Sequence, residues 1–177
     1  MIFVTVGTHE QPFNRLVEYM DRWAGSHDEE VFIQTGYTKY APKNCRYASF
    51  ISRDEMVRYI RSARIVVTHG GPCCYTDVLK EGKIPVVVPR SKAFGEQIDD
   101  HQIEIGREYR RHYGNIVLVE DIDRLDDAIG RYDELIKDRD VSAGISHNEA
   151  FCADFSRTVD QLFETEETTW RAKRIYP

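Results

Sequence analysis

A glycine pair between an apolar run and a helical segment is the feature of this sequence best suited to hold a ligand. Thr68-His69-Gly70-Gly71-Pro72 follows the β-branched run 64–68 and precedes a helix expected over 73–80. Pro72 suits the first helical position, where its missing N–H costs nothing. Backbone N–H groups left uncovered at such a helix start carry a partial positive charge. The segment is therefore a candidate binding turn for a phosphate or diphosphate, although a tight turn without a ligand has the same pattern.

A second glycine turn and a carboxylate could contact other parts of the same ligand. Gly7 and Thr8 follow an apolar run, so the glycine would keep the backbone close and the threonine would supply a hydroxyl. Asp77 lies two turns into the helix at 73–80, where it could accept hydrogen bonds from ribose hydroxyls. On spacing alone, a solvated helix charge explains Asp77 equally well.

The segment 96–102 is dense in groups that bind hydroxyls. Its Asp, His and Gln side chains offer both donors and acceptors, as needed to grip a sugar. An acidic helix start that complements the dipole would explain Asp99 and Asp100, but not the His and Gln that follow. Three histidines, at positions 9, 69 and 101, could share one edge, but their spacing matches no metal-ligand motif, and we expect no metal site.

Strand-like and helix-like segments alternate along the chain. We expect strands at 2–6, 31–35, 46–50, 64–68, 84–88 and 115–119. We expect helices at 12–24, 73–80, 99–113, 123–136 and 148–163. A further short helix should begin at a capping box formed by Ser52 and Glu55. Gly25, Gly82 and Gly114 would follow helix ends. This alternation predicts an α/β fold, a mostly parallel sheet with helices on both faces. Ligands bind at the carboxyl ends of such strands, where all the polar segments above lie.

Length and composition indicate one globular domain, which we place at residues 1–163, followed by a polar tail at 164–177. Trp170, Ile175 and Tyr176 are the tail's few apolar residues and could dock on a partner. A net charge of -6, without a basic stripe, argues against nucleic acid as a partner. No run of 18 apolar residues and no charged leader segment is present, so we expect a cytoplasmic protein with reduced cysteines.

Two common nucleotide-binding fingerprints are absent from the sequence. Neither glycine turn has the G-x-G-x-x-G pattern, which lowers the expectation of a dehydrogenase. No G-x-x-x-x-G-K-[ST] segment is present either, so ATP held by a P-loop is not expected.

Several motifs in this order resemble the C-terminal, donor-binding half of family 28 glycosyltransferases. They are Val4–Thr8, Pro12–Phe13, Arg15–Val17, Thr68–Pro72, Val86–Arg90, Phe94–Glu96 and Asp99–Gln102. The resemblance covers about residues 1–120. It is strongest to short bacterial polysaccharide glycosyltransferase subunits, which are similar to the soluble catalytic subunit of the two-chain dolichol-diphosphate N-acetylglucosaminyltransferase.

The resemblance implies one Rossmann-like half of a GT-B enzyme that binds a UDP-sugar without a cofactor or metal. The sugar would pass to a lipid-diphosphate-linked saccharide in cell-surface polysaccharide biosynthesis. A separate membrane-anchored subunit would hold this acceptor and keep the chain at the inner face of the membrane. The implied donor-binding residues are Gly7, Thr8, Ile51, Met56, His69, Gly70, Gly71, Asp77, Glu96, Asp100, His101 and Gln102.

The resemblance also implies a role for each part of this set. The backbone from Ile51 to Met56 would contact uracil and Asp77 the ribose. The sugar would be contacted by Glu96, Asp100, His101 and Gln102. His69, with the helix start, would face the diphosphate and stabilise the leaving UDP. The family more often has Glu at the position of Asp77, and small residues where this chain has Cys73 and Cys74. No residue is assigned as the general base, for which His9 and His101 are candidates, and we expect it on the partner.

Two other functions agree with the same residues. One is a non-catalytic UDP-sugar-binding helper subunit, which would bind donor but never support turnover. The other is a stand-alone sugar-nucleotide epimerase or hydrolase, which would turn over without a partner.

Overall fold

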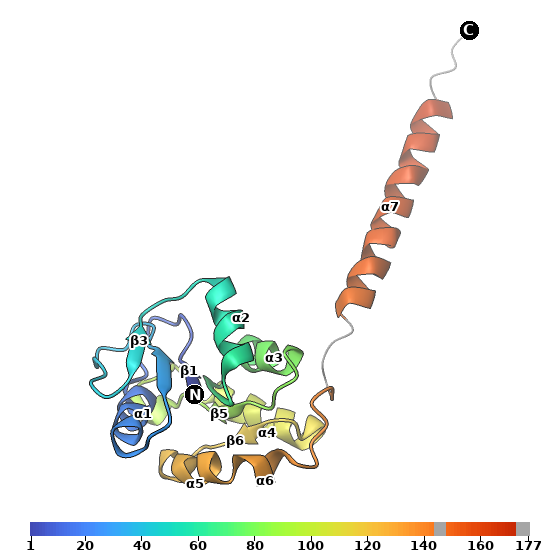
Figure 1. The fold of residues 1–177 in the computed structure, drawn as a ribbon. Helices are drawn as coiled ribbons and strands as arrows, with labels where there is room; N and C mark the ends of the chain where they lie inside the picture. The colour runs from blue at the N-terminus through green and yellow to red at the C-terminus, as the bar shows by residue number, and fades with distance from the viewer. Residues whose placement is uncertain (144–147, 173–177) are drawn as a thin grey trace. The chain divides into compact units, whose positions relative to one another are not determined.

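The computed structural model describes residues 1–143 and 148–172, the latter with side chains at 151–163. The chain divides into two compact units, Met1–Ile145 and Ser146–Pro177. The first unit contains a single sheet with its helices (Figure 1).

The sheet has six strands, and every neighbouring pair is parallel. The strands are β1 (Ile2–Thr5), β2 (Val31–Gln34), β3 (Arg46–Ala48), β4 (Ile65–His69), β5 (Val86–Val88) and β6 (Val117–Leu118). Their order, β3-β2-β1-β4-β5-β6, is that of the Rossmann fold, in which the direction of winding reverses between β1 and β4. The predicted Rossmann-like parallel sheet is confirmed.

Helices cover both faces of the sheet because successive side chains of a strand point to opposite faces (Figure 1). Ile2 and Val4 of β1 belong to a core with the apolar face of helix α1 (Asn14–Ser26). Phe3, between them, belongs to a second core with α2 (Arg53–Ser62) and α3 (Pro72–Lys80). Burial on both faces explains why the central strands are apolar at almost every position.

Four of the local signals at the helix ends behave as predicted. Ser52 and Glu55 form a capping box at the start of α2, and Pro72 occupies the first turn of α3. Gly82 and Gly114 have positive φ angles of 73° and 68° after α3 and α4. The other helical segments are the 3₁₀ turns Lys92–Phe94 and Ile122–Arg124 and the helices α4 (His101–Tyr113), α5 (Leu125–Gly130) and α6 (Tyr132–Ile136).

Most element ends differ from the predicted ones by one or two residues, and two differences within the first unit involve a glycine. The helix expected at 123–136 is interrupted after Gly130 and starts with a 3₁₀ turn. Gly25 lies inside α1 rather than beyond its end. A Cβ at this position would lie 2.9 Å from Cγ of Asn44, so Gly25 allows a loop to pack closely against the helix.

The second unit contains the helix α7 (Asn148–Ala172), which continues past the predicted end at Phe163. The first unit ends at Ile145, whereas the predicted domain extended to residue 163. Phe151, Phe155 and Leu162 of α7 are exposed. The end of the predicted tail, residues 173–177, lies outside the described residues. Within the described segments, no helix is both long and apolar enough to cross a bilayer.

Arg90, in the loop after β5, joins this loop to the one between β1 and α1 at the carboxyl edge of the sheet. Its Nη2 donates to the carbonyl oxygen of Val6 at 2.9 Å. Its Nη1 donates to the carbonyl oxygens of Gln11 at 2.7 Å and Glu96 at 3.2 Å. The guanidinium also lies over the ring of Phe13, and the whole residue is only 1% exposed. Burial lowers the pKa of Arg90 to about 10, so the side chain keeps its charge at neutral pH.

We predict that Arg90→Met lowers the free energy of unfolding by about 3 kcal/mol or more. The substitution leaves three carbonyl oxygens without their donor, and each unpaired buried group costs roughly 1–3 kcal/mol. Urea denaturation followed by circular dichroism measures the change. Arg107→Met is the control, because Arg107 is exposed and its ion pair with Glu120 lies at the surface, and it should cost less than about 1 kcal/mol. Equal losses for the two variants would contradict the prediction.

Candidate functional site

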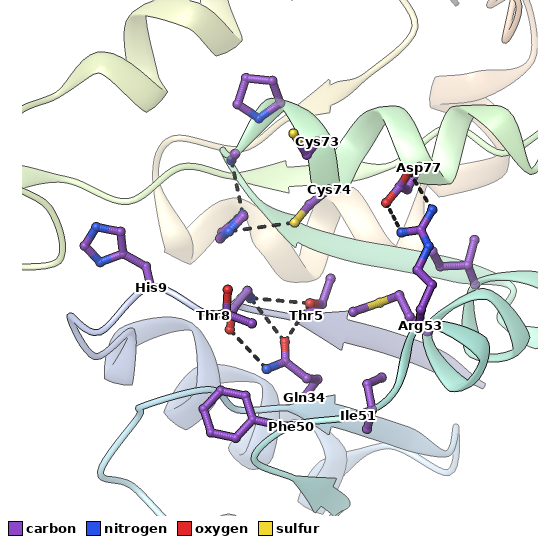
Figure 2. Close-up of a pocket in the computed structure, with 16 residues that line it drawn as sticks. Thr5, Thr8, His9, Gln34, Phe50, Ile51, Arg53, Cys73, Cys74 and Asp77 are labelled. Carbon is purple, nitrogen blue, oxygen red and sulfur yellow. Dashed lines mark hydrogen bonds and ion pairs between the residues drawn. The ribbon is translucent and has the colours of Figure 1, made fainter. Parts of the chain in front are cut away.

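A pocket of about 590 Å³ lies at the carboxyl ends of β1, β2 and β4, next to α2 and α3 (Figure 2). Its position at the reversal between β1 and β4 is where ligands bind in sheets of this kind. Its size falls in the range of small-molecule sites. The lining residues are Thr5, Gly7, Thr8, His9, Gln34, Phe50, Ile51, Arg53, Met56, Ile60, His69, Gly71, Pro72, Cys73, Cys74 and Asp77.

His69, at the end of β4, is a neutral imidazole with a fixed tautomer. Burial lowers its pKa to about 3, and the nearby charges of Arg90 and His9 act in the same direction. The N–H of Gly71 donates to Nδ1 of His69 at 3.1 Å, so this nitrogen is the acceptor. The proton of the neutral ring is therefore on Nε2, which lies 3.8 Å from the sulfur of Cys74. His69 can donate a hydrogen bond to a ligand without carrying a charge.

The start of α3 offers fewer free N–H groups than the sequence suggests. Gly71 uses its N–H on the His69 ring, and Pro72 has none. Cys74 donates to the carbonyl oxygen of Gly71 at 3.0 Å. The N–H of Cys73 forms no hydrogen bond with any residue that the structure describes. A ligand at this helix start would thus meet the Cys73 N–H and the Nε2–H of His69.

Gln34, the last residue of β2, fixes the turn after β1. Its Oε1 accepts from the N–H of Gly7 at 3.1 Å and from the hydroxyl of Thr5 at 2.7 Å. Its Nε2 donates to the carbonyl oxygens of Gly7 at 3.0 Å and Ser49 at 2.8 Å. Sequence reasoning missed Gln34. The signal that could have identified Gln34 is an amide side chain at the end of a buried apolar strand.

The turn at Gly7 requires glycine for two reasons. Its φ angle is +75°, in the left-handed region. A Cβ built on Gly7 would also lie 2.3 Å from Nε2 of His69. The two turns that the sequence singled out, after β1 and after β4, therefore approach each other in the pocket.

Asp77 lies at the end of the pocket opposite His9 (Figure 2). Both of its carboxylate oxygens accept from the guanidinium of Arg53, a residue that sequence reasoning did not select. This interaction with Arg53 lowers the pKa of the Asp77 carboxyl. Ile51 and Met56 line the same pocket, as the resemblance implies for the base-binding segment.

The predicted sugar-contacting residues lie outside the residues that line the pocket. Glu96 is 3% exposed, and its carboxylate accepts from Arg15 at 2.9 Å and from the N–H of Ser91 at 3.0 Å. Asp100 accepts from the hydroxyl of Ser91 at 3.0 Å and the N–H of Lys92 at 2.8 Å. Both carboxylates therefore hold the loop that follows β5.

Gln102 and His101, the other two predicted sugar-contacting residues, have different environments. Gln102 is buried, and its Oε1 accepts from the N–H of Arg90 at 3.1 Å. Its Cβ would lie 2.8 Å from a Cβ built on Gly70, which explains the glycine there. His101 is exposed and pairs with Asp99. The predicted contacts of these residues with a sugar stay predictions.

The described residues contain no group of three or more His, Cys, Asp or Glu side chains arranged to hold a metal ion.

Comparison with protein families identifies the chain. The model of the glycosyltransferase family 28 C-terminal domain matches residues 1–133, which include the whole sheet and every residue lining the pocket. The chain belongs to glycosyltransferase family 28.

A solved structure with the same fold is described as the glycotransferase of kitacinnamycin. It superposes with a TM-score of 0.53 at 19% sequence identity, over 77% of this chain and 35% of that one. The chain thus spans about a third of that glycosyltransferase. The comparison with curated proteins gave no significant match.

The neutral state of His69 predicts a pH-dependent stability. Its pKa is lowered from 6.5 to about 3 in the folded chain, so the unfolded chain binds the extra proton. Stability should therefore be fully present above pH 6.5 and fall by about 1.4 kcal/mol per pH unit below it. Urea denaturation at pH 7, 6 and 5 should show this slope, and His69→Gln should remove it. His112→Gln is the exposed control, and parallel pH curves for wild type and His69→Gln would refute the idea.

Proposed function

We propose that this chain is the donor-binding half of a glycosyltransferase that takes a sugar from a UDP-sugar. The observation that carries the proposal is the pairing of two donors at the start of α3, the Cys73 N–H and the Nε2–H of His69. Both residues line a pocket at the point where the sheet reverses its winding. Such an arrangement favours a diphosphate, because the helix dipole adds to both hydrogen bonds.

The rest of the pocket suits the other parts of a uridine nucleotide. Uracil would lie against the segment from Ile51 to Met56, whose backbone can contact the edge of the base. Ribose hydroxyls would donate to the carboxylate of Asp77, one turn from the diphosphate. The transferred sugar would extend towards Gly70 and Gln102, beyond the pocket.

In the transfer step, an acceptor hydroxyl attacks C1 of the sugar, and the bond from C1 to the diphosphate oxygen breaks. Negative charge develops on the departing UDP, and the two donors at the start of α3 are placed to stabilise it. A general base takes the proton of the acceptor hydroxyl. His9 lines the pocket and His101 does not, so His9 is the better candidate within this chain. We expect the base on a partner.

The acceptor would be held by a second, membrane-anchored subunit. A GT-B cleft is built from two facing domains, and the sheet of the first unit would supply one of them. We propose a lipid-diphosphate-linked saccharide as the acceptor and cell-surface polysaccharide as the product. The partner would keep this chain at the inner face of the membrane.

We predict that the chain binds UDP equally well in excess chelator and in Mg²⁺, because its own N–H donors form the phosphate site. Isothermal titration calorimetry measures both affinities. ADP should bind at least about tenfold more weakly, since a purine does not fit a uracil site. Binding that requires the metal, or equal affinity for ADP, would be incompatible with the proposal.

We further predict that sugar transfer needs the partner. The chain should transfer sugar to a lipid-linked acceptor when it is co-expressed with the acceptor-binding subunit, and not alone. Radiolabelled UDP-sugar and extraction of the lipid product measure transfer. Robust transfer or UDP-sugar turnover by the chain alone would favour a stand-alone enzyme. Donor binding without turnover, even beside the partner, would favour a helper subunit.

A further inference from the structure

The Arg53–Asp77 ion pair is positioned to respond to the nucleotide. Arg53 is the first residue of α2, Asp77 lies on α3, and both line the pocket. The guanidinium takes both carboxylate oxygens of Asp77, one of them at 3.1 Å. The pair therefore links α2 to α3 at one end of the pocket, as Figure 2 shows.

The pair also contains the permanent charges of the pocket. Among the sixteen lining residues, all of them described, Arg53 is the only arginine or lysine and Asp77 the only carboxylate. Their charges cancel while the pair is closed. A nucleoside diphosphate brings at least two negative charges, and apart from the neutral donors at α3 the pocket offers it one cation, which Asp77 holds.

Arg53 can leave Asp77 at little cost. Its side chain is 64% exposed, so water solvates the released guanidinium, and exposed ion pairs add little to stability. Asp77, which is 20% exposed, keeps an ion pair with Lys80 at 3.6 Å. Cys74, in the first turn of α3, lines the same pocket as Arg53. Phosphate oxygens accept from a guanidinium in the same two-pronged geometry as a carboxylate, and they carry more charge.

We propose that Arg53 is a nucleotide-binding residue that exchanges partners, held by Asp77 when the pocket is empty and by the diphosphate when the donor is bound. The exchange frees carboxylate oxygens of Asp77 for the ribose hydroxyls at the moment when ribose arrives. This inference rests on the proposed function, since it takes UDP as the ligand.

Calorimetry with UDP and uridine on the full chain tests the exchange. Arg53→Gln removes the charge, so UDP should bind about tenfold more weakly while uridine changes less than about twofold. Arg53→Lys keeps the charge without the fork and should recover part of the loss. If Arg53→Gln weakens UDP and uridine equally, or neither, the exchange is wrong.

A second pair in the same protein provides a matched control. Arg61 and Glu81 form a two-pronged ion pair, with contacts of 2.6 and 3.2 Å, and have exposures of 68% and 21% against 64% and 20% for Arg53 and Asp77. Neither residue lines the pocket. Arg61→Gln should leave the affinities for UDP and uridine unchanged. If Arg53→Gln behaves like Arg61→Gln while wild type binds UDP, the inference alone is overturned.

A double-mutant comparison separates direct contact from support of Asp77. If Arg53 contacts the diphosphate, Arg53→Gln should still weaken UDP about tenfold when Asp77 is already Asn. If Arg53 only positions Asp77, the second substitution should add nothing, which would refute the exchange. A wild-type chain that binds neither UDP nor uridine would overturn the proposed function and this inference together.

Discussion

A buried cation without a carboxylate of its own organises the edge of the sheet that contains the pocket. Arg90 donates to three carbonyl oxygens, two in the loop after β1 and one in the loop after β5, and the carboxylate nearest in sequence, Glu96, is committed to Arg15. Removing a guanidinium from water is costly, and these three hydrogen bonds offset part of that cost. The turn after β1 and the loop after β5 consequently hold one another in place, and the adjoining pocket takes its shape from this arrangement.

The sequence predicts the fold well because the relevant signals are local. Burial on both faces makes the central strands continuously apolar, and the capping box, Pro72 and the left-handed glycines each act within a single turn. The errors came where distant packing decides. Gly25 resembles a helix end in the sequence, but its role is to admit Asn44, a residue from another loop. Gly130 divides a stretch that periodicity alone treats as one helix.

In the candidate site, too, some features could be predicted from the sequence and others depend on distant packing. The two glycine turns could be placed because residues that follow parallel strands share one edge, and Ile51 and Met56 were placed by the family resemblance. The hydrogen-bond and ion-pair partners of these side chains could not be predicted, since they depend on the directions in which the side chains point. Glu96 forms an ion pair with Arg15, and Arg53 forms one with Asp77. Gln34 accepts a hydrogen bond from the N–H of Gly7. Polar residues near a site thus either meet the ligand or hold the loops around it, and composition does not distinguish the two.

The central place of β1 constrains when the protein can fold during synthesis. Ile2 pairs with Val31 on one side and with Ile65 on the other, so the strand that appears first lacks its second neighbour until β4 has left the ribosome. At roughly 5–20 residues per second, that delay lasts several seconds. An unpaired apolar strand is a template for aggregation in this interval. Chaperone dependence should therefore be set by β1, the strand that also carries the glycine turn of the pocket.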